Sequence, residues 1–72
     1  MDLPSKWLYY LENKPETGMG YHIVSIILNS GERYNQVVVV EGRITEIRNI
    51  AEIPFKSEDI KEIILTHDKW RF

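Results

Sequence analysis

The segment Val37–Ile44 reads VVVVEGRI, and it is the strongest indication of the fold in this chain. A strand with one buried face needs an apolar residue only at every second position, whereas consecutive valines present apolar side chains to both faces of a sheet. The dipeptide Glu41-Gly42 then interrupts the run, and such a pair resembles the two-residue signal for a tight hairpin. The segment therefore predicts a strand that is covered on both faces and turns back directly into another strand.

The runs on either side of the valines also resemble strands. Tyr21–Leu28 reads YHIVSIIL and ends at a turn over 29–32 that contains a glycine, and Arg43–Arg48 reads RITEIR. Turn signals at intervals of about 8–12 residues are typical of a small antiparallel meander. We therefore expect a hairpin between Tyr21–Leu28 and Arg33–Val40, closed at 29–32, and a third strand after Gly42.

The two faces of the predicted sheet follow from the alternation of side chains along each strand. We expect Val38 and Val40 to fill the interior of a curled sheet, while the opposite face meets the N-terminal segment or an identical subunit. The predicted interaction surface combines outward-facing aliphatic side chains with one tryptophan near each end of the chain: Trp7, Ile23, Ile27, Val37, Val39 and Trp70.

The N-terminal segment, residues 1–14, has apolar residues at helical spacing, at Leu3, Trp7, Leu8 and Leu11. This spacing favours a short helix over 5–12, with Pro4 and Ser5 in its first turn. The aromatic residues of the same segment are also compatible with an extended conformation.

The C-terminal third allows two interpretations. Ser57 is a good N-cap and is followed by two acidic residues, which favours a helical turn at 57–60. The β-branched run after it then predicts a strand over about 61–67, which would close a barrel against the first strand. Apolar spacing over 58–66 also allows one continuous helix.

Length and composition restrict the classes of function. Seventy-two residues form one domain, with an N-terminal segment 1–14, a β core 21–67 and a tail 68–72. The absence of cysteine excludes disulfides, thiolate metal sites and a cysteine nucleophile. The net charge of −2 argues against a dependence on nucleic-acid phosphates. No apolar run approaches the ~20 residues of a membrane helix and no signal-peptide pattern is present, so we expect a cytoplasmic protein.

The stretch Ile23–Tyr34, IVSIILNSGERY, resembles the first signature of Sm-like proteins, with Leu28, Gly31 and Tyr34 at matching positions. Gln36 and Asn49 stand where the two Sm signatures carry glycine. The pattern is shared with other SH3-like small barrels, so the resemblance implies the barrel and not RNA binding. The pieces TGMGY, IPF and THDKW are also similar to a group of short bacterial proteins with no assigned function. We thus expect a mainly β domain, an SH3- or Sm-like barrel or curled sheet of four to five antiparallel strands with a short N-terminal helix.

A metal site is the most specific chemical hypothesis that the sequence offers. His22 opens the first predicted strand, His67 ends the last, and Asp68 follows. Two imidazoles and a carboxylate could hold Zn²⁺ with an open position if the strands pair antiparallel. The alternative is two surface histidines at strand ends.

The remaining patterns favour binding over catalysis. No nucleophile motif, phosphate-binding glycine loop or acid–base pair is present, so we expect no enzyme activity and no cofactor. Aromatic residues near Arg33, Arg43 and Arg48 could stack on bases, but nearby glutamates weaken such a surface. The sequence predicts a non-catalytic module that binds a protein or its own copy. A nucleic-acid-binding barrel is the alternative.

Overall fold

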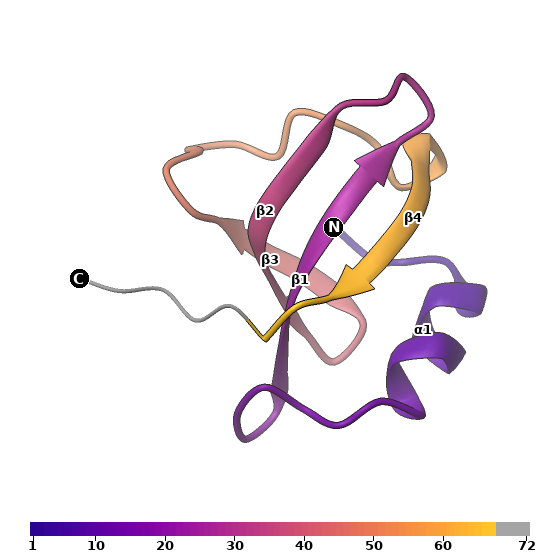
Figure 1. The fold of residues 1–72 in the computed structure, drawn as a ribbon, viewed down its shortest axis with the longest axis vertical. Coiled ribbons are helices and arrows are strands. Elements are labelled where there is room, and N and C mark those ends of the chain that lie inside the picture. Colours follow the sequence, from indigo (N-terminus) through magenta and orange to yellow (C-terminus); the bar gives the residue numbers. More distant parts are fainter. Residues whose placement is uncertain (68–72) are drawn as a thin grey trace.

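The computed structural model describes residues 1–67, and its main feature is one antiparallel sheet with the strand order β3-β2-β1-β4 (Figure 1). A single α-helix precedes the sheet, and a 3₁₀ turn, η1, leads into the last strand. The elements are α1 Ser5–Glu12, β1 Tyr21–Leu28, β2 Arg33–Val40, β3 Arg43–Ile47, η1 Ser57–Asp59 and β4 Ile60–Leu65. The helix predicted over 5–12 is confirmed, and so is the mainly β architecture.

Both predicted hairpins are confirmed. At the first, the Leu28 N–H donates to the Glu32 carbonyl at 2.9 Å, and Gly31 adopts a φ of 94° that suits glycine. At the second, Glu41 and Gly42 have φ values of 50° and 75°. Two successive residues with positive φ give the turn a twist that matches the flanking strands.

The C-terminal third forms a turn followed by a strand, as the first of the two interpretations predicted. The Asp59 carboxylate accepts the Lys56 N–H at 3.0 Å and stabilises η1. The Asp59 carbonyl accepts the Asn29 N–H at 2.8 Å, which joins this turn to the first hairpin. β4 then runs antiparallel to β1. The continuous helix over 58–66 is therefore wrong, because β-branched residues here pair with a neighbouring strand.

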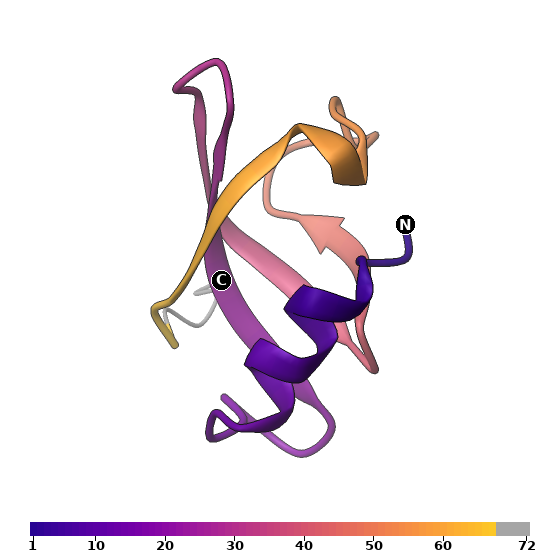
Figure 2. The same ribbon diagram turned by 90° about the vertical axis from the view of Figure 1, so that its right-hand side faces the viewer.

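The sheet curls but remains open, so the predicted closed barrel is not confirmed. β1 pairs with both β2 and β4, while β3 and β4 form the two edges and do not pair with each other. Three register shifts, one in each strand pair, increase the bend of the sheet. α1 lies in the concavity between the edge strands (Figure 2). The outer edge of β3 is already paired with the first residues of the chain.

The hydrophobic core lies on the concave side of the sheet, against α1. It contains Leu3, Leu11, Val24, Ile26, Leu28, Val37, Val39, Ile44, Ile47, Phe55, Ile60 and Ile63. Val37 and Val39 are 0% and 1% exposed, so the prediction that they face outward is wrong. The physical reason is the strand register, which places Val37 directly opposite the core residue Val24.

Candidate interaction surface

The outer face of the sheet is the face turned away from α1 and the core. It is formed by the residues of β1 and β2 that alternate with the core residues, and by the β4 residue that pairs with one of these outer residues. These are Tyr21, Ile23, Ser25, Ile27, Val38, Val40 and Ile64. Within residues 1–67, no helix or strand lies over this face (Figure 2). Tyr21, Ile27, Val38, Val40 and Ile64 are only half-buried.

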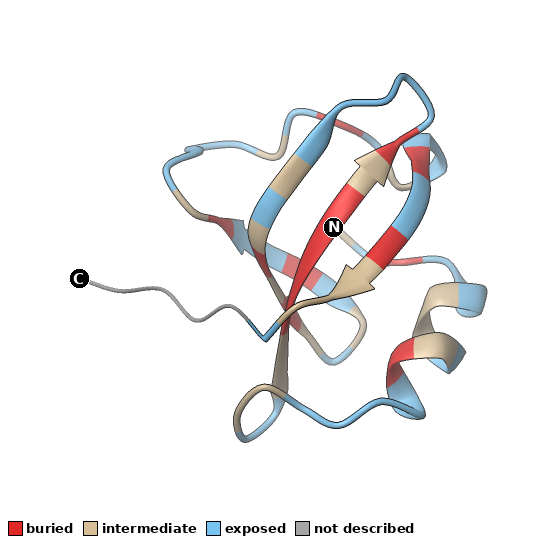
Figure 3. Cartoon of the chain, viewed as in Figure 1, coloured by how far each residue is buried: buried red, intermediate tan, exposed pale blue. Residues whose placement is uncertain are grey.

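The centre of the outer face is nonetheless buried along β1 (Figure 3). Ile23 is 3% exposed. Its N–H donates to the Thr17 hydroxyl at 2.8 Å, and its carbonyl accepts the N–H groups of Thr66 and His67 at 3.3 and 3.1 Å. The loop before β1 and the end of β4 therefore meet at Ile23 and border the outer face.

A hydrogen bond between two polar side chains lies on the outer face, close to Ile23. The Ser25 hydroxyl, in a residue that is 2% exposed, donates to Asn35 Oδ1 at 2.7 Å. Arg33 Nε donates to the same oxygen at 2.9 Å. Because buried hydroxyls are costly without a partner, this bond lets Ser25 lie between apolar neighbours without a desolvation penalty. It also fixes Arg33 and Asn35 at the border of the half-buried aliphatic side chains.

The predicted interaction surface is divided between the two faces. Ile23 and Ile27 lie on the outer face, but Val37 and Val39 belong to the core. Trp7 packs against the core from α1 and makes an edge-to-face contact with Tyr10, with 5.8 Å between the ring centroids. Trp70 lies outside the described residues. The sequence missed Val38, Val40 and Ile64, since alternation identifies two faces but does not indicate which one is covered.

The two histidines contact different partners. His22 Nε2 lies 3.3 Å from the Lys14 carbonyl, so the ring can donate there only from its Nε2–H form. His67 Nδ1 lies 2.7 Å from the Thr17 hydroxyl. Residues 1–67 contain no group of three His, Cys, Asp or Glu side chains that could hold a metal ion. Asp68 is outside the described residues, and the predicted zinc site stays a prediction.

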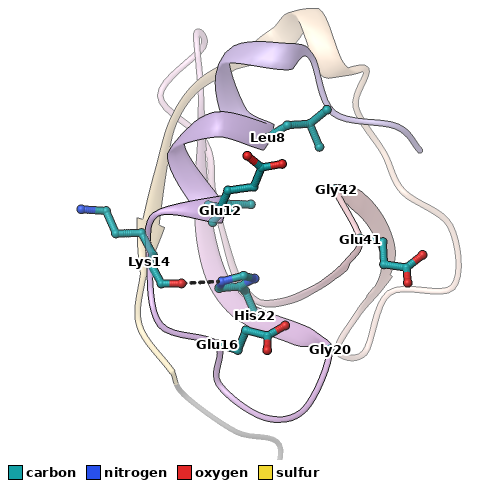
Figure 4. A pocket seen from close by; sticks show the side chains of 9 residues that line it. Leu8, Glu12, Lys14, Glu16, Gly20, His22, Glu41 and Gly42 are labelled. Atoms are coloured by element: carbon teal, nitrogen blue, oxygen red, sulfur yellow. Dashed lines mark hydrogen bonds between the residues drawn. The ribbon is translucent and has the colours of Figure 1, made fainter.

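A second candidate is a cavity of about 650 Å³ at the end of α1 (Figure 4). It lies between α1, the loop before β1 and the turn joining β2 to β3. Leu8 and Leu11 contribute its apolar part, and three carboxylates surround its opening, from Glu12, Glu16 and Glu41. This lining would repel anionic ligands. His22, at the start of β1, also lines this cavity. The sequence did not predict the cavity, because its lining comes from α1, the following loop, β1 and the β2–β3 turn.

The polar and aromatic side chains near the sheet edges pair with each other. Arg43 Nε donates to the Asp2 carboxylate at 2.8 Å; this hydrogen bond lowers the pKa of Asp2 and raises the pKa of Arg43. The Tyr34 hydroxyl donates to Glu32 at 3.1 Å, which raises the pKa of Tyr34. Its ring contacts Phe55, with 5.2 Å between the centroids. Arg43, which was considered for base stacking, and Tyr34 thus have acidic partners.

No family model, curated protein or solved structure matches the chain. Within residues 1–67, no helix has the length and apolar character needed to cross a membrane.

Proposed function

We propose that the protein is a non-catalytic interaction module, and that it binds another protein chain through the outer face of its sheet. The observation that supports this is the difference between the two faces. The chain covers the concave face with α1, whereas Ile27, Val38, Val40 and Ile64 stay half-buried on the other. Covering a few hundred Å² of apolar surface would contribute several kcal/mol, at about 25 cal/mol per Å².

The arrangement of polar groups supports the same proposal. Arg33, Glu46 and Glu62 are exposed and pair with Ile27 or Val38 in neighbouring strands. An apolar centre surrounded by charged residues is the usual composition of a protein–protein interface. Charges of both signs surround the patch, which favours a protein partner over a polyanion.

The curl of the sheet also supports the proposed likeness to SH3- and Sm-like domains. Gln36 and Asn49 occupy the two positions where the Sm signatures carry glycine, and their φ values are 54° and 65°. Few residues other than glycine adopt such values without strain. We propose that the same backbone bends occur here without the glycines. The likeness concerns the bend of the sheet and adds no RNA-binding activity.

A charge introduced on the outer face tests the proposed function. Wild type, Val38→Lys and Met19→Lys would be immobilised and incubated with extract of the native cells, with and without nuclease. Met19 is 99% exposed, in the loop before β1, so this control adds the same charge away from the sheet. We expect wild type and Met19→Lys to retain the same proteins, and folded Val38→Lys to lose them.

Nuclease treatment separates the proposal from its alternative. Bound proteins should stay when nucleic acid is digested. Release by nuclease would favour the nucleic-acid-binding barrel. Retention of the same proteins by Val38→Lys would contradict the outer face as the binding surface.

A further inference from the structure

The two edges of the sheet differ in how their backbone groups are satisfied. Residues 1–3 run antiparallel along the outer edge of β3. The Ile44 N–H donates to the Met1 carbonyl at 2.8 Å, the Met1 amine donates to the Ile44 carbonyl at 3.1 Å, and the Leu3 N–H donates to the Gly42 carbonyl at 2.9 Å. An exposed ion pair between Asp2 and Arg43 also joins this segment to β3. The β3 edge is therefore closed to further strands at Arg43 and Ile44.

The outer edge of β4 has no such cover within residues 1–67. The Thr66 N–H donates to the Ile23 carbonyl, and Ile64 is paired with Ser25. Because backbone groups alternate in direction along an antiparallel strand, the N–H and C=O groups of Ile63 and Leu65 point away from β1. Figure 2 shows no further strand along the outer side of β4.

Charges protect only the first half of this edge. Lys61 and Glu62 are exposed at the start of β4, next to the register shift. Lysine, other charges and bulges are common devices against unwanted strand pairing. The second half, Ile63–Leu65, carries no charge, and such an uncharged edge is a template for another strand.

We infer that the second half of β4 pairs antiparallel with β4 of a second copy of this chain, a contact at the sheet edge that goes beyond the proposed binding through the outer face. A twofold axis normal to the sheet places equivalent side chains of the two copies on the same face of the joined sheet. One residue must then lie opposite the same residue of the second copy. The geometry points to Ile64 at the axis. Ile63 then faces the partner's Leu65, and their outward N–H and C=O groups form the new ladder.

Two registers shifted toward the start of β4 are less favourable. With Glu62 at the axis, two identical carboxylates would face each other, which destabilises a strand pair. With Ile63 at the axis, Glu62 would lie opposite the apolar Ile64. With Ile64 at the axis, Glu62 lies opposite Thr66, a small polar residue.

The outer face supplies the reason for choosing a second copy. Ile64 is half-buried on that face, beside β1 and its Ile27. Pairing about Ile64 brings the aliphatic patches of two copies together and continues one curled sheet into the other. An unrelated strand would gain the backbone bonds but would not supply a second patch.

Complementary charges at Ile64 test the inference by sedimentation. Ile64→Lys and Ile64→Glu alone should each be monomeric at concentrations where wild type is a dimer, because like charges meet at the axis. An equimolar mixture should regain a heterodimer. Val38→Lys should remain dimeric, since it changes the outer face but not the edge. A wild-type monomer at millimolar concentration, or a mixture that stays monomeric, would overturn the inference.

Amide hydrogen exchange of the wild type provides a second measurement that needs no variant. Exchange of the Ile63 and Leu65 amides should slow as protein concentration rises through the dimer range, whereas that of Ile64, bonded within the sheet, should not change. Concentration-independent exchange at Leu65 in a dimeric sample would exclude the β4 edge. If that dimer were also lost in Val38→Lys, the outer face would remain as the contact. Loss of partners by Val38→Lys from extract would then still support the proposed function.

Discussion

Val37 and Val38 are neighbours with identical side chains, yet they meet opposite surroundings. Val37 is 0% exposed and lies opposite Val24 in the core, whereas Val38 lies opposite Ile23 on the outer face and remains half-buried. The inner face is covered by residues far away in sequence, including Leu3, Leu11 and Phe55. The difference shows that the burial of these two valines depends on where α1 and the loop between β3 and η1 fold back, and not on the apolar character of a strand residue.

Lysine substitutions on the two faces should give the largest difference. Val39→Lys places an unpaired charge in the core, and we expect a loss of at least about 4 kcal/mol, close to the whole stability of a small domain. Val38→Lys can keep its ammonium group in water, so we expect a change below about 1 kcal/mol. Urea unfolding followed by circular dichroism measures both. Equal losses would mean that the outer face is as fully covered as the inner one.

The packing of α1 against the inner face of the sheet can be tested by a substitution at Gly42. A Cβ at this position would overlap the Leu8 side chain, and the residue also has a φ of 75°. We expect Gly42→Ala to cost about 2 kcal/mol, from backbone strain and displacement of the Leu8 side chain.

Gly31→Ala is the matched control, because Gly31 has a φ of 94° and a Cβ added there would meet no atom within 4 Å. It should cost only the backbone strain, about 1 kcal/mol. The difference between the two unfolding free energies measures the contact between α1 and the β2–β3 turn. Equal costs would contradict that contact.

The buried hydroxyl on the outer face should have a smaller effect. Ser25→Ala removes the hydrogen bond to Asn35 Oδ1, but this oxygen keeps the bond from Arg33. We expect a loss of about 1 kcal/mol, the usual contribution of a satisfied hydrogen bond. Thermal unfolding measures the change, and Ser30→Ala in the exposed turn is the control. A loss no larger than that of the control would mean that water satisfies Ser25.

The smallest effect is expected from the ion pair at the β3 edge. Arg43 lowers the pKa of Asp2 below its ordinary value of 3.8 in the folded protein. The pair therefore stabilises the fold above pH 3.8, and this contribution is lost as pH falls through the lowered pKa. Both side chains are exposed, so the effect is small. An NMR titration should show the pKa of Asp2 rising in Arg43→Gln. An unchanged pKa would exclude the pair in solution.

Local patterns in the sequence were sufficient to predict where each element lies. The helix at 5–12, the hairpins at 29–32 and 41–42, and the turn before the last strand follow from helical spacing, turn residues and β-branched runs. These signals act over a few residues, since they depend on backbone preferences and on the alternation of side chains. The division of the valines into two faces was also predictable.

Only the tertiary structure decided which valines are inside, whether the sheet closes, and which residues surround the cavity at α1. The orientation of the valines depends on the pairing of Val37 with Val24, a contact between separate strands. The sheet stays open, with α1 in its concavity and residues 1–3 paired with the start of the β3 edge. A one-residue change in register would exchange the faces without altering any local preference, and so local sequence could not determine them.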